Sequence, residues 1–133
     1  MANNIYKLSP GCVYNIGYHI VWCPKYRKAV LIGDIANDIK SLLYQKAKDI
    51  NVSIESLEVM PDHIHIFVSC KPTMLIHHIV QQFKGYTSHV IRNKYQDIKR
   101  KLPTLWSRSY YVGTIGFVSE TTVRNYIAQQ KGK

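Results

Sequence analysis

The sequence predicts an α+β sandwich in which two helices cover one face of a four-stranded sheet. Segments rich in β-branched and aromatic residues alternate with segments of helical apolar spacing, in the order β-α-β-β-α-β, and one further helix follows. This order is the split βαβ pattern of ferredoxin-like and RRM-like folds. The chain has 133 residues, and two domains would each lie near the lower size limit for a hydrophobic core. We therefore treat residues 1–133 as a single domain.

The first strand and the first helix follow from residue type and spacing. Residues 13–23 are β-branched and aromatic and end at Pro24, which predicts a strand. Residues 32–50 predict a helix, because their apolar side chains recur at helical intervals along one stripe. That stripe consists of Ile32, Ile35, Ala36, Ile39, Leu42, Leu43, Ala47 and Ile50. Residues 1–11 precede both elements, and we expect them to form a flexible arm.

A hairpin is predicted in the middle of the chain. Residues 52–60 and 63–70 are expected to form its strands, and Pro61 and Asp62 its turn. Side chains alternate along a strand, so we expect Asp62 to point away from the histidine that follows it.

The second helix of the sandwich is predicted to open after Pro72, with Thr73 as its N-cap. Its apolar stripe consists of Ile76, Ile79, Val80, Phe83, Thr87, Val90 and Ile91. A flank away from that stripe is predicted to be a solvated face and carries Lys84, Ser88 and Arg92.

The last third of the chain is predicted as a loop, a strand and a helix. Residues 97–109 are basic and contain a proline, which favours a loop, and residues 110–117 favour a strand. Ser119 is a suitable N-cap, and Glu120 is favourable at the positive end of a helix that reaches about Gln130.

Composition excludes several classes of protein. Hydrophobic residues make up 46% of the chain, but no apolar run approaches the roughly 20 residues that a membrane span needs. The N-terminal residues lack the apolar region of a secretory signal. Cys12, Cys23 and Cys70 are odd in number and form no CxxC pair, so we expect reduced thiols and a cytoplasmic protein. Membrane, secreted, zinc-ribbon and fibrous proteins are thereby excluded.

The charge indicates a phosphate-rich partner. Eighteen Lys and Arg oppose eight Asp and Glu, a net charge of +10, and ten tyrosines could stack on unpaired bases. A ribosomal protein, a nucleic-acid enzyme and a simple binder all fit this balance. The basic and aromatic clusters are equally compatible with solvated loops. The candidate DNA contacts are Lys25, Arg27, Lys28, Lys99, Arg100, Lys101, Arg108 and Tyr110.

Two histidines on the second hairpin strand could hold a metal. His63 and His65 are two residues apart, so both imidazoles face one side, about 7 Å apart along the strand. Ile64 and Ile66 point to the opposite, helix-covered side, which leaves the histidines on the open face. Two half-exposed strand histidines without a ligand are the alternative. His19 lies on the first strand, and the sequence does not fix which face it shares.

The last predicted helix, over residues 119–131, carries a second pair of polar groups. Tyr126 and Gln130 are four residues apart and therefore lie on one helical face. A tyrosine hydroxyl can act as a covalent nucleophile, and a glutamine carbonyl is an uncharged oxygen ligand. The alternative for Tyr126 is an amphipathic side chain that packs the helix onto the sheet.

Four segments together resemble one family of enzymes. The run Pro61-Asp-His-Ile-His-Ile66 is similar to the HUH signature, in which U is hydrophobic, and residues 123–130 resemble the helix of its single-tyrosine members. Residues 18–27 resemble their first strand and its exit, and residues 101–106 the loop before their last strand. The family is the TnpA-type transposases of small insertion sequences that move as single-stranded DNA. The resemblance extends over residues 14–130.

The resemblance implies a set of roles. His63 and His65 would be metal ligands, Gln130 the third ligand and Tyr126 the single nucleophile. The metal would be Mg²⁺ or Mn²⁺. The enzyme would cut single-stranded DNA beside hairpins through a 5′-phosphotyrosine, as a homodimer in which the tyrosine helix can complete the partner's site. No P-loop motif is present, in agreement with chemistry that needs no nucleotide.

Three alternatives remain open at the level of sequence. A REP-associated tyrosine transposase, resident in its host, would share the fold and the site and differ in its DNA. An RRM-like binder without chemistry would carry Lys/Arg-Gly-Phe/Tyr type motifs on its central strands, and these are absent. A two-histidine phosphoesterase would carry a second HxT or HxS block, and the chain has a single HxH.

Overall fold

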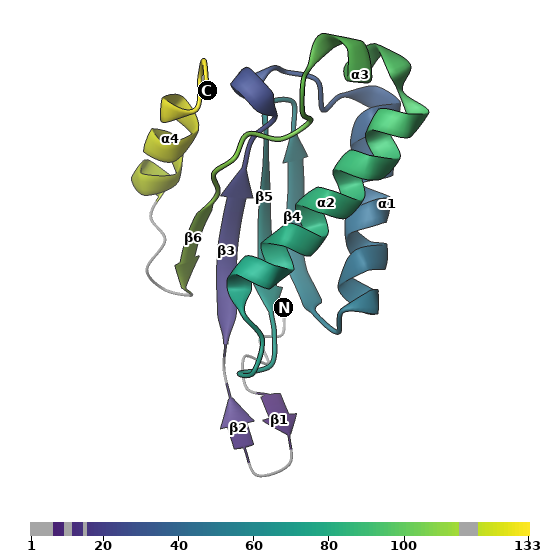
Figure 1. The fold of residues 1–133 in the computed structure, drawn as a ribbon. Helices are drawn as coiled ribbons and strands as arrows, with labels where there is room; N and C mark the ends of the chain where they lie inside the picture. Colours follow the sequence, from purple (N-terminus) through teal and green to yellow (C-terminus); the bar gives the residue numbers. More distant parts are fainter. Residues whose placement is uncertain (1–6, 10–11, 15, 115–119) are drawn as a thin grey trace.

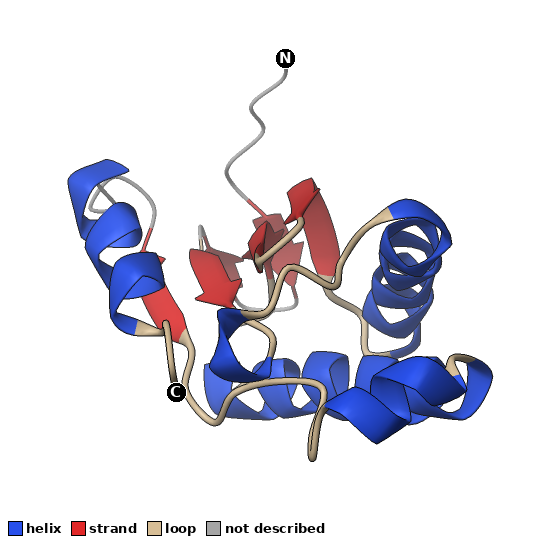
Figure 2. Ribbon diagram, turned by 90° about the horizontal axis from the view of Figure 1, so that it is seen from above, coloured by secondary structure: helices blue, strands red, loops and turns tan. Residues whose placement is uncertain are grey.

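A computed structural model describes residues 7–9, 12–14, 16–114 and 120–133 and contains the predicted sandwich (Figure 1). The four strands of the main sheet are antiparallel neighbours in the order β4-β5-β3-β6. Their bounds are Gly17–Trp22 for β3, Ser53–Met60 for β4, His63–Ser69 for β5 and Tyr111–Thr114 for β6. The helices α1 (Gly33–Asp49) and α2 (Ile76–Lys94) cover one face and leave the other open (Figure 2). The predicted fold class is confirmed.

The core forms where the helix stripes meet the inward side chains of the sheet. Along β5, Ile64, Ile66 and Val68 are fully buried, whereas the residues between them are half-exposed. Trp22 of β3 and Phe83 of α2 are also fully buried, with ring centroids 6.3 Å apart. Alternation along β5 therefore directs its histidines to the open face, because its aliphatic side chains fill the core.

Strand register places particular residues side by side on the open face. His65 of β5 pairs with Val21 of β3, and Val21 pairs with Tyr111 of β6. His19 pairs with Phe67, and their rings stack with centroids 4.6 Å apart. The register thus resolves the open question about His19, which shares the face of the two predicted metal ligands.

The N-terminal region contains a small hairpin outside the main sheet. Strand β1 (Lys7–Ser9) pairs with β2 (Cys12–Tyr14), and β3 begins only at Gly17, so the predicted strand over residues 13–23 is divided in two. The rest of the expected arm, residues 1–6 and 10–11, lies outside the described residues.

Two predictions about helices are wrong. Helix α2 begins at Ile76, and its N-cap is the extended residue Leu75, so Thr73 does not cap it. The segment before it is a turn, closed by a 3.1 Å hydrogen bond from the Met74 N–H to the Lys71 carbonyl. The predicted loop over residues 97–109 starts with a helix, α3 (Gln96–Lys101). Its proline lies beyond the helix end and therefore does not prevent the helix.

The C-terminal helix α4 (Glu120–Gln129) lies beside β6 at the sheet edge, on the side opposite α1 (Figures 1 and 2). The predicted N-cap, Ser119, and the end of the predicted strand over residues 110–117 lie outside the described residues. Cys23 and Cys70 are buried free thiols, as predicted, and the side chain of Cys12 is not among those described. Across the described segments, no helix is long and apolar enough to cross a membrane.

Candidate active site

The turn before β5 fixes the orientation of His63. The Asp62 carboxylate lies 2.9 Å from Nδ1 of His63, and a carboxylate only accepts, so Nδ1–H is the donor. The Nε2 lone pair is then available, as in metal sites where a carboxylate orients a histidine ligand. The prediction that Asp62 points away from His63 is wrong, because Asp62 belongs to the turn and strand alternation does not apply to it.

His65 lies in a cluster of imidazoles on the open face. Its Nε2 is 3.2 Å from Nδ1 of His19, and its Nδ1 is 3.8 Å from the Glu58 carboxylate. Burial lowers the pKa of both His65 and His19; the nearby His63 lowers the pKa of His65 further, whereas Glu58 raises it. Both rings are therefore neutral at pH 7, which is the form of imidazole that binds a metal.

A serine joins the two polar residues of α4. The Oγ of Ser109 donates to the Gln130 side-chain oxygen at 3.0 Å and lies 2.8 Å from the Tyr126 hydroxyl. Because Ser109 has one proton, the Tyr126 O–H is the donor in the second bond. Burial raises the pKa of Tyr126, and the bond to Ser109 partly opposes this rise. No sequence pattern singles out Ser109, which lies 21 residues before Gln130.

The structure brings the predicted site residues together as two pairs. His63 and His65 lie on β5, whereas Tyr126 lies on α4 and Gln130 directly follows the last residue of that helix. Strands β3 and β6 lie between these elements in the sheet order. Among the described residues, no hydrogen bond or ring contact joins either histidine directly to Tyr126 or Gln130.

The donor set fits a divalent metal in its chemistry. Neutral imidazoles and an uncharged amide oxygen suit several divalent ions. Within the described segments, no cluster of three His, Cys, Asp or Glu side chains could hold an ion. The predicted third ligand, Gln130, offers an amide oxygen, and this residue is only 5% exposed.

A lysine of α2 supports the segment that carries Ser109. The Nζ of Lys84 donates to the carbonyls of Ser107, Arg108 and Ser109 at 2.8, 3.4 and 3.3 Å. Burial lowers the pKa of Lys84 to about 8, so it is mostly protonated at pH 7. The predicted solvated face is wrong here, because the segment after α3 returns along α2.

The same correction applies to Arg92. Its guanidinium donates to the Leu102 carbonyl at 2.7 Å and is therefore bound to the protein instead of pointing into solvent. Ser88, the third residue of that flank, is half-buried.

The basic candidates for DNA contact differ in their surroundings. Lys25 and Arg108 lie with Lys133 around a small recess of about 210 Å³ that also contains Ser109 and Gln130. Lys28, Lys99 and Arg100 are exposed, and Arg100 is paired with Asp97. Arg27 is bound within the protein, and Tyr110 lies near His77, with ring centroids 6.2 Å apart. Contact of these residues with DNA stays a prediction.

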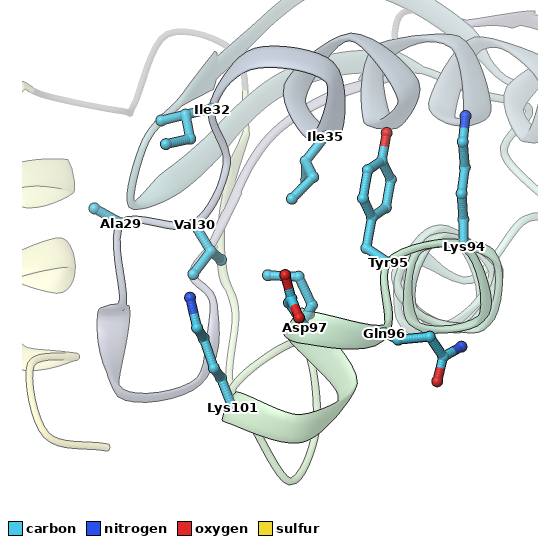
Figure 3. A pocket seen from close by; sticks show the side chains of 10 residues that line it. Ala29, Val30, Ile32, Ile35, Lys94, Tyr95, Gln96, Asp97 and Lys101 are labelled. Atoms are coloured by element: carbon cyan, nitrogen blue, oxygen red, sulfur yellow. The ribbon is translucent and has the colours of Figure 1, made fainter.

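A larger cavity of about 540 Å³ lies away from both pairs, between the start of α1 and the α2–α3 corner (Figure 3). Its walls combine the aliphatic residues Val30, Ile32 and Ile35 with Tyr95 and Lys101. It contains none of the predicted catalytic or metal-binding residues.

The chain is similar to known transposases over most of its length. The family described as "Transposase IS200 like" matches residues 12–130. The ISDra2 transposase TnpA of Deinococcus radiodurans is 34% identical over 129 residues, 96% of this chain and 92% of that protein. The transposase for insertion sequence element IS200 of Salmonella typhimurium is 32% identical, covering 88% of this chain and 78% of its own.

Solved structures support the same assignment. A crystal structure of a candidate transposase from Deinococcus radiodurans has a TM-score of 0.89 and 30% identity, over 96% of this chain and 99% of that one. A REP-associated tyrosine transposase bound to a REP hairpin has a TM-score of 0.59 over 84% of this chain and 62% of its own, and at 12% identity it shows the shared fold alone. On this evidence the chain belongs to the IS200-like transposase family.

Proposed function

We propose that this transposase cleaves and rejoins single-stranded DNA beside hairpins, with Tyr126 as the nucleophile and a divalent metal at His63 and His65. The observation that carries the proposal is the open face of β5, where a carboxylate on Nδ1 leaves the Nε2 of His63 available for a ligand. The helix beside β6 supplies the proposed nucleophile, the Tyr126 hydroxyl, which can form a covalent bond to phosphate.

Three uncharged ligands would hold the metal. His63, His65 and the Gln130 oxygen bring no negative charge, so a bound Mg²⁺ or Mn²⁺ would retain its full charge and polarise a phosphoryl oxygen. The Gln130 oxygen accepts a hydrogen bond from Ser109, and its second lone pair is the one that a metal would use.

The reaction follows from the chemistry of phenol. The Tyr126 oxygen attacks phosphorus and gives its proton to water, the bond from phosphorus to the 3′ oxygen breaks, and that oxygen takes up a proton from water to become a 3′-hydroxyl. Phenol has a pKa of about 10, so phenolate is a better leaving group than an alkoxide, and a 3′-hydroxyl can attack the phosphotyrosine and expel the tyrosine oxygen to rejoin strands. The hydrogen bond to Ser109 uses the Tyr126 proton and leaves the lone pairs of the phenol oxygen free for this attack.

Two comparisons bear on the substrate and the role. The REP-associated relative is bound to a DNA hairpin, which supports a hairpin partner for this chain. Identities of 34% and 32% with the transposases of ISDra2 and IS200, against 12% with the REP-associated enzyme, favour a mobile-element transposase over a host-resident one. We further propose a homodimer in which α4 can complete the site of the partner.

The test is a search for a covalent protein–DNA adduct. The protein is incubated with labelled hairpin-bearing single strands from its own genome neighbourhood and Mg²⁺ or Mn²⁺, and the adduct is digested and located by mass spectrometry. We expect Tyr126 to be linked to the 5′-phosphate of one DNA strand, and the released strand to carry a free 3′-hydroxyl. Hairpin binding without cleavage under any metal condition would favour the RRM-like binder instead.

A further inference from the structure

One arginine connects the two halves of the site. The Nε of Arg27 lies 3.3 Å from Oδ2 of Asp62, and its Nη1 donates to the Ile127 carbonyl at 3.2 Å. The other oxygen of Asp62 accepts the Nδ1 proton of His63. A continuous series of polar contacts therefore leads from a predicted metal ligand on β5 to the residue that follows Tyr126 on α4.

The turn that holds Arg27 has an unusual backbone. Tyr26 and Arg27 have φ values of +60° and +52°, a region that residues other than glycine rarely adopt. Hydrogen bonds on both sides maintain it: the Arg27 N–H donates to the Pro24 carbonyl at 2.8 Å, and the Lys25 N–H donates to Leu105 at 2.9 Å. Backbone strain of this kind persists where surrounding contacts over-determine it, often at functional positions.

The carbonyl that Arg27 contacts belongs to the last turn of α4. The final carbonyls of a helix lack partners within it and carry the negative end of its dipole, so a guanidinium is favourable there. Ile127 lies directly after Tyr126, and its carbonyl also accepts the Gln130 N–H at 3.1 Å. The contact thus fixes the turn that carries both predicted functional groups of α4.

We propose that Arg27 is a positioning residue that couples the docking of α4 to the orientation of His63. The guanidinium is a planar fork whose separate N–H groups can bind a carboxylate and a carbonyl at once, which a lysine ammonium does less well. Held by Arg27, Asp62 keeps its other oxygen on Nδ1 of His63, and Nε2 stays directed outward. The inference rests on the proposed function, since it assigns a supporting residue to the same site.

Coupling of this kind acts in both directions. If α4 leaves the sheet edge, Arg27 loses one of its two partners and Asp62 is held less firmly. A ligand that binds His63 raises the equilibrium constant for docking of α4 by some factor. Docking of α4 then raises the affinity for that ligand by the same factor. The two halves of the site would therefore form together, although one comes from the middle of the chain and the other from near its C-terminus.

The test uses Arg27→Lys in the full-length protein, with Arg92→Lys as the matched control. Arg92 also donates to a carbonyl, Leu102, but lies outside this series of contacts. In metal-free protein, we expect several-fold faster amide hydrogen exchange at residues 124–130 in Arg27→Lys and no change in β5. In ¹⁵N-histidine spectra, we expect the His63 shifts to move toward a mixture of tautomers. For Mn²⁺ binding measured by calorimetry without DNA, we expect about tenfold weaker affinity.

A second variant separates this inference from the proposed function. Asp62→Asn keeps the size of the side chain and removes its charge, and combining it with Arg27→Lys should weaken Mn²⁺ binding no further than the worse single change. Unchanged exchange in α4 together with unchanged His63 shifts in Arg27→Lys would overturn the coupling, even if the wild type binds Mn²⁺ through His63. Absence of Mn²⁺ binding to the wild type would instead count against the proposed metal. The amide hydrogen exchange at residues 124–130 and the ¹⁵N chemical shifts of His63 would still decide the role of Arg27.

Discussion

The strand that carries the histidines and the helix that carries the tyrosine are held in different ways. Strand β5 is central, hydrogen-bonded on both sides, and its inward residues Ile64, Ile66 and Val68 are fully buried. Helix α4 lies outside the edge strand and is attached through polar contacts at Ser109 and Arg27. Regions with little buried apolar surface open at lower free energy than a sheet core. We infer that the half of the site on β5, with His63 and His65, is rigid, and that the half on α4, with Tyr126, can be repositioned.

Removing the nucleophile should have the largest effect. Tyr126→Phe deletes one hydroxyl and keeps the ring, so we expect the covalent adduct to disappear while folding and hairpin binding stay close to wild type. Tyr111→Phe is the matched control, because Tyr111 lies on β6 with its ring centroid 6.0 Å from that of Tyr126. Adduct formation by the Tyr126→Phe protein at the wild-type rate would refute the assignment.

Removing a predicted metal ligand on β5 should also stop DNA cleavage, although the nucleophile stays in place. His63→Ala should reduce cleavage by at least about a hundredfold, since loss of a metal ligand removes charge stabilisation worth several kcal/mol. Hairpin affinity should change little, because basic residues supply it through phosphate contacts. Filter binding and adduct formation, measured side by side, give the two quantities. Unchanged cleavage in excess chelator would exclude the metal.

Mixing two inactive proteins tests whether Tyr126 acts in the site of its own subunit or in that of the partner. His63→Ala and Tyr126→Phe subunits, once exchanged, form heterodimers with one site that has intact histidines and, if α4 acts in trans, an intact tyrosine. We expect part of the cleavage to return. Exchange must be shown separately, for example by tagged-subunit capture. With exchange verified, continued inactivity would mean that α4 acts in its own chain, where the structure places it beside β6.

The same contrast explains what the sequence could and could not predict. Alternation placed His63 and His65 on the open face, and helical spacing placed Tyr126 and Gln130 together, because both patterns are local. Contacts between distant segments left no such pattern: Arg27 lies 100 residues from Ile127, and Lys84 lies 23 from Ser107. The sequence predicts Arg27 as a DNA contact or part of a solvated loop and Lys84 as part of a solvated helix face. Their contacts with the rest of the site are therefore visible only in the fold.

Loosening the attachment of α4 should have a moderate effect. Ser109→Ala removes the hydroxyl that binds both Tyr126 and Gln130, and the loss of such hydrogen bonds costs about 1 kcal/mol of folding stability. Once Tyr126 loses its proton, the Ser109 hydroxyl can donate to the phenolate, which lowers the pKa of Tyr126, so loss of this hydroxyl should raise that pKa. A difference titration of tyrosine absorbance against the Tyr126→Phe protein measures this shift. An unchanged pKa would mean that the hydroxyls do not meet in solution.

The smallest expected effect concerns the lysine beneath Ser109, and its sign follows from linkage. Burial lowers the pKa of Lys84 from 10.5 to about 8, so between these values the unfolded chain holds a proton that the folded protein lacks. Stability contributed by Lys84 therefore rises as pH increases from about 8 to 10.5, and below pH 8 the burial penalty is constant.

Urea unfolding of the wild type and Lys84→Met from pH 7 to 10 isolates this contribution, because other titrating groups are common to both proteins. Between pH 8 and 10, we expect the unfolding free energy of the wild type to rise relative to that of Lys84→Met by on the order of 1 kcal/mol. Lys94→Met is the control with the opposite sign, since the hydrogen bond to Asp38 raises the pKa of Lys94 and its contribution is lost only at higher pH. A difference for Lys84→Met that stays flat across this range would show that water reaches the ammonium, and that the segment bearing Ser109 is held as loosely as α4 itself.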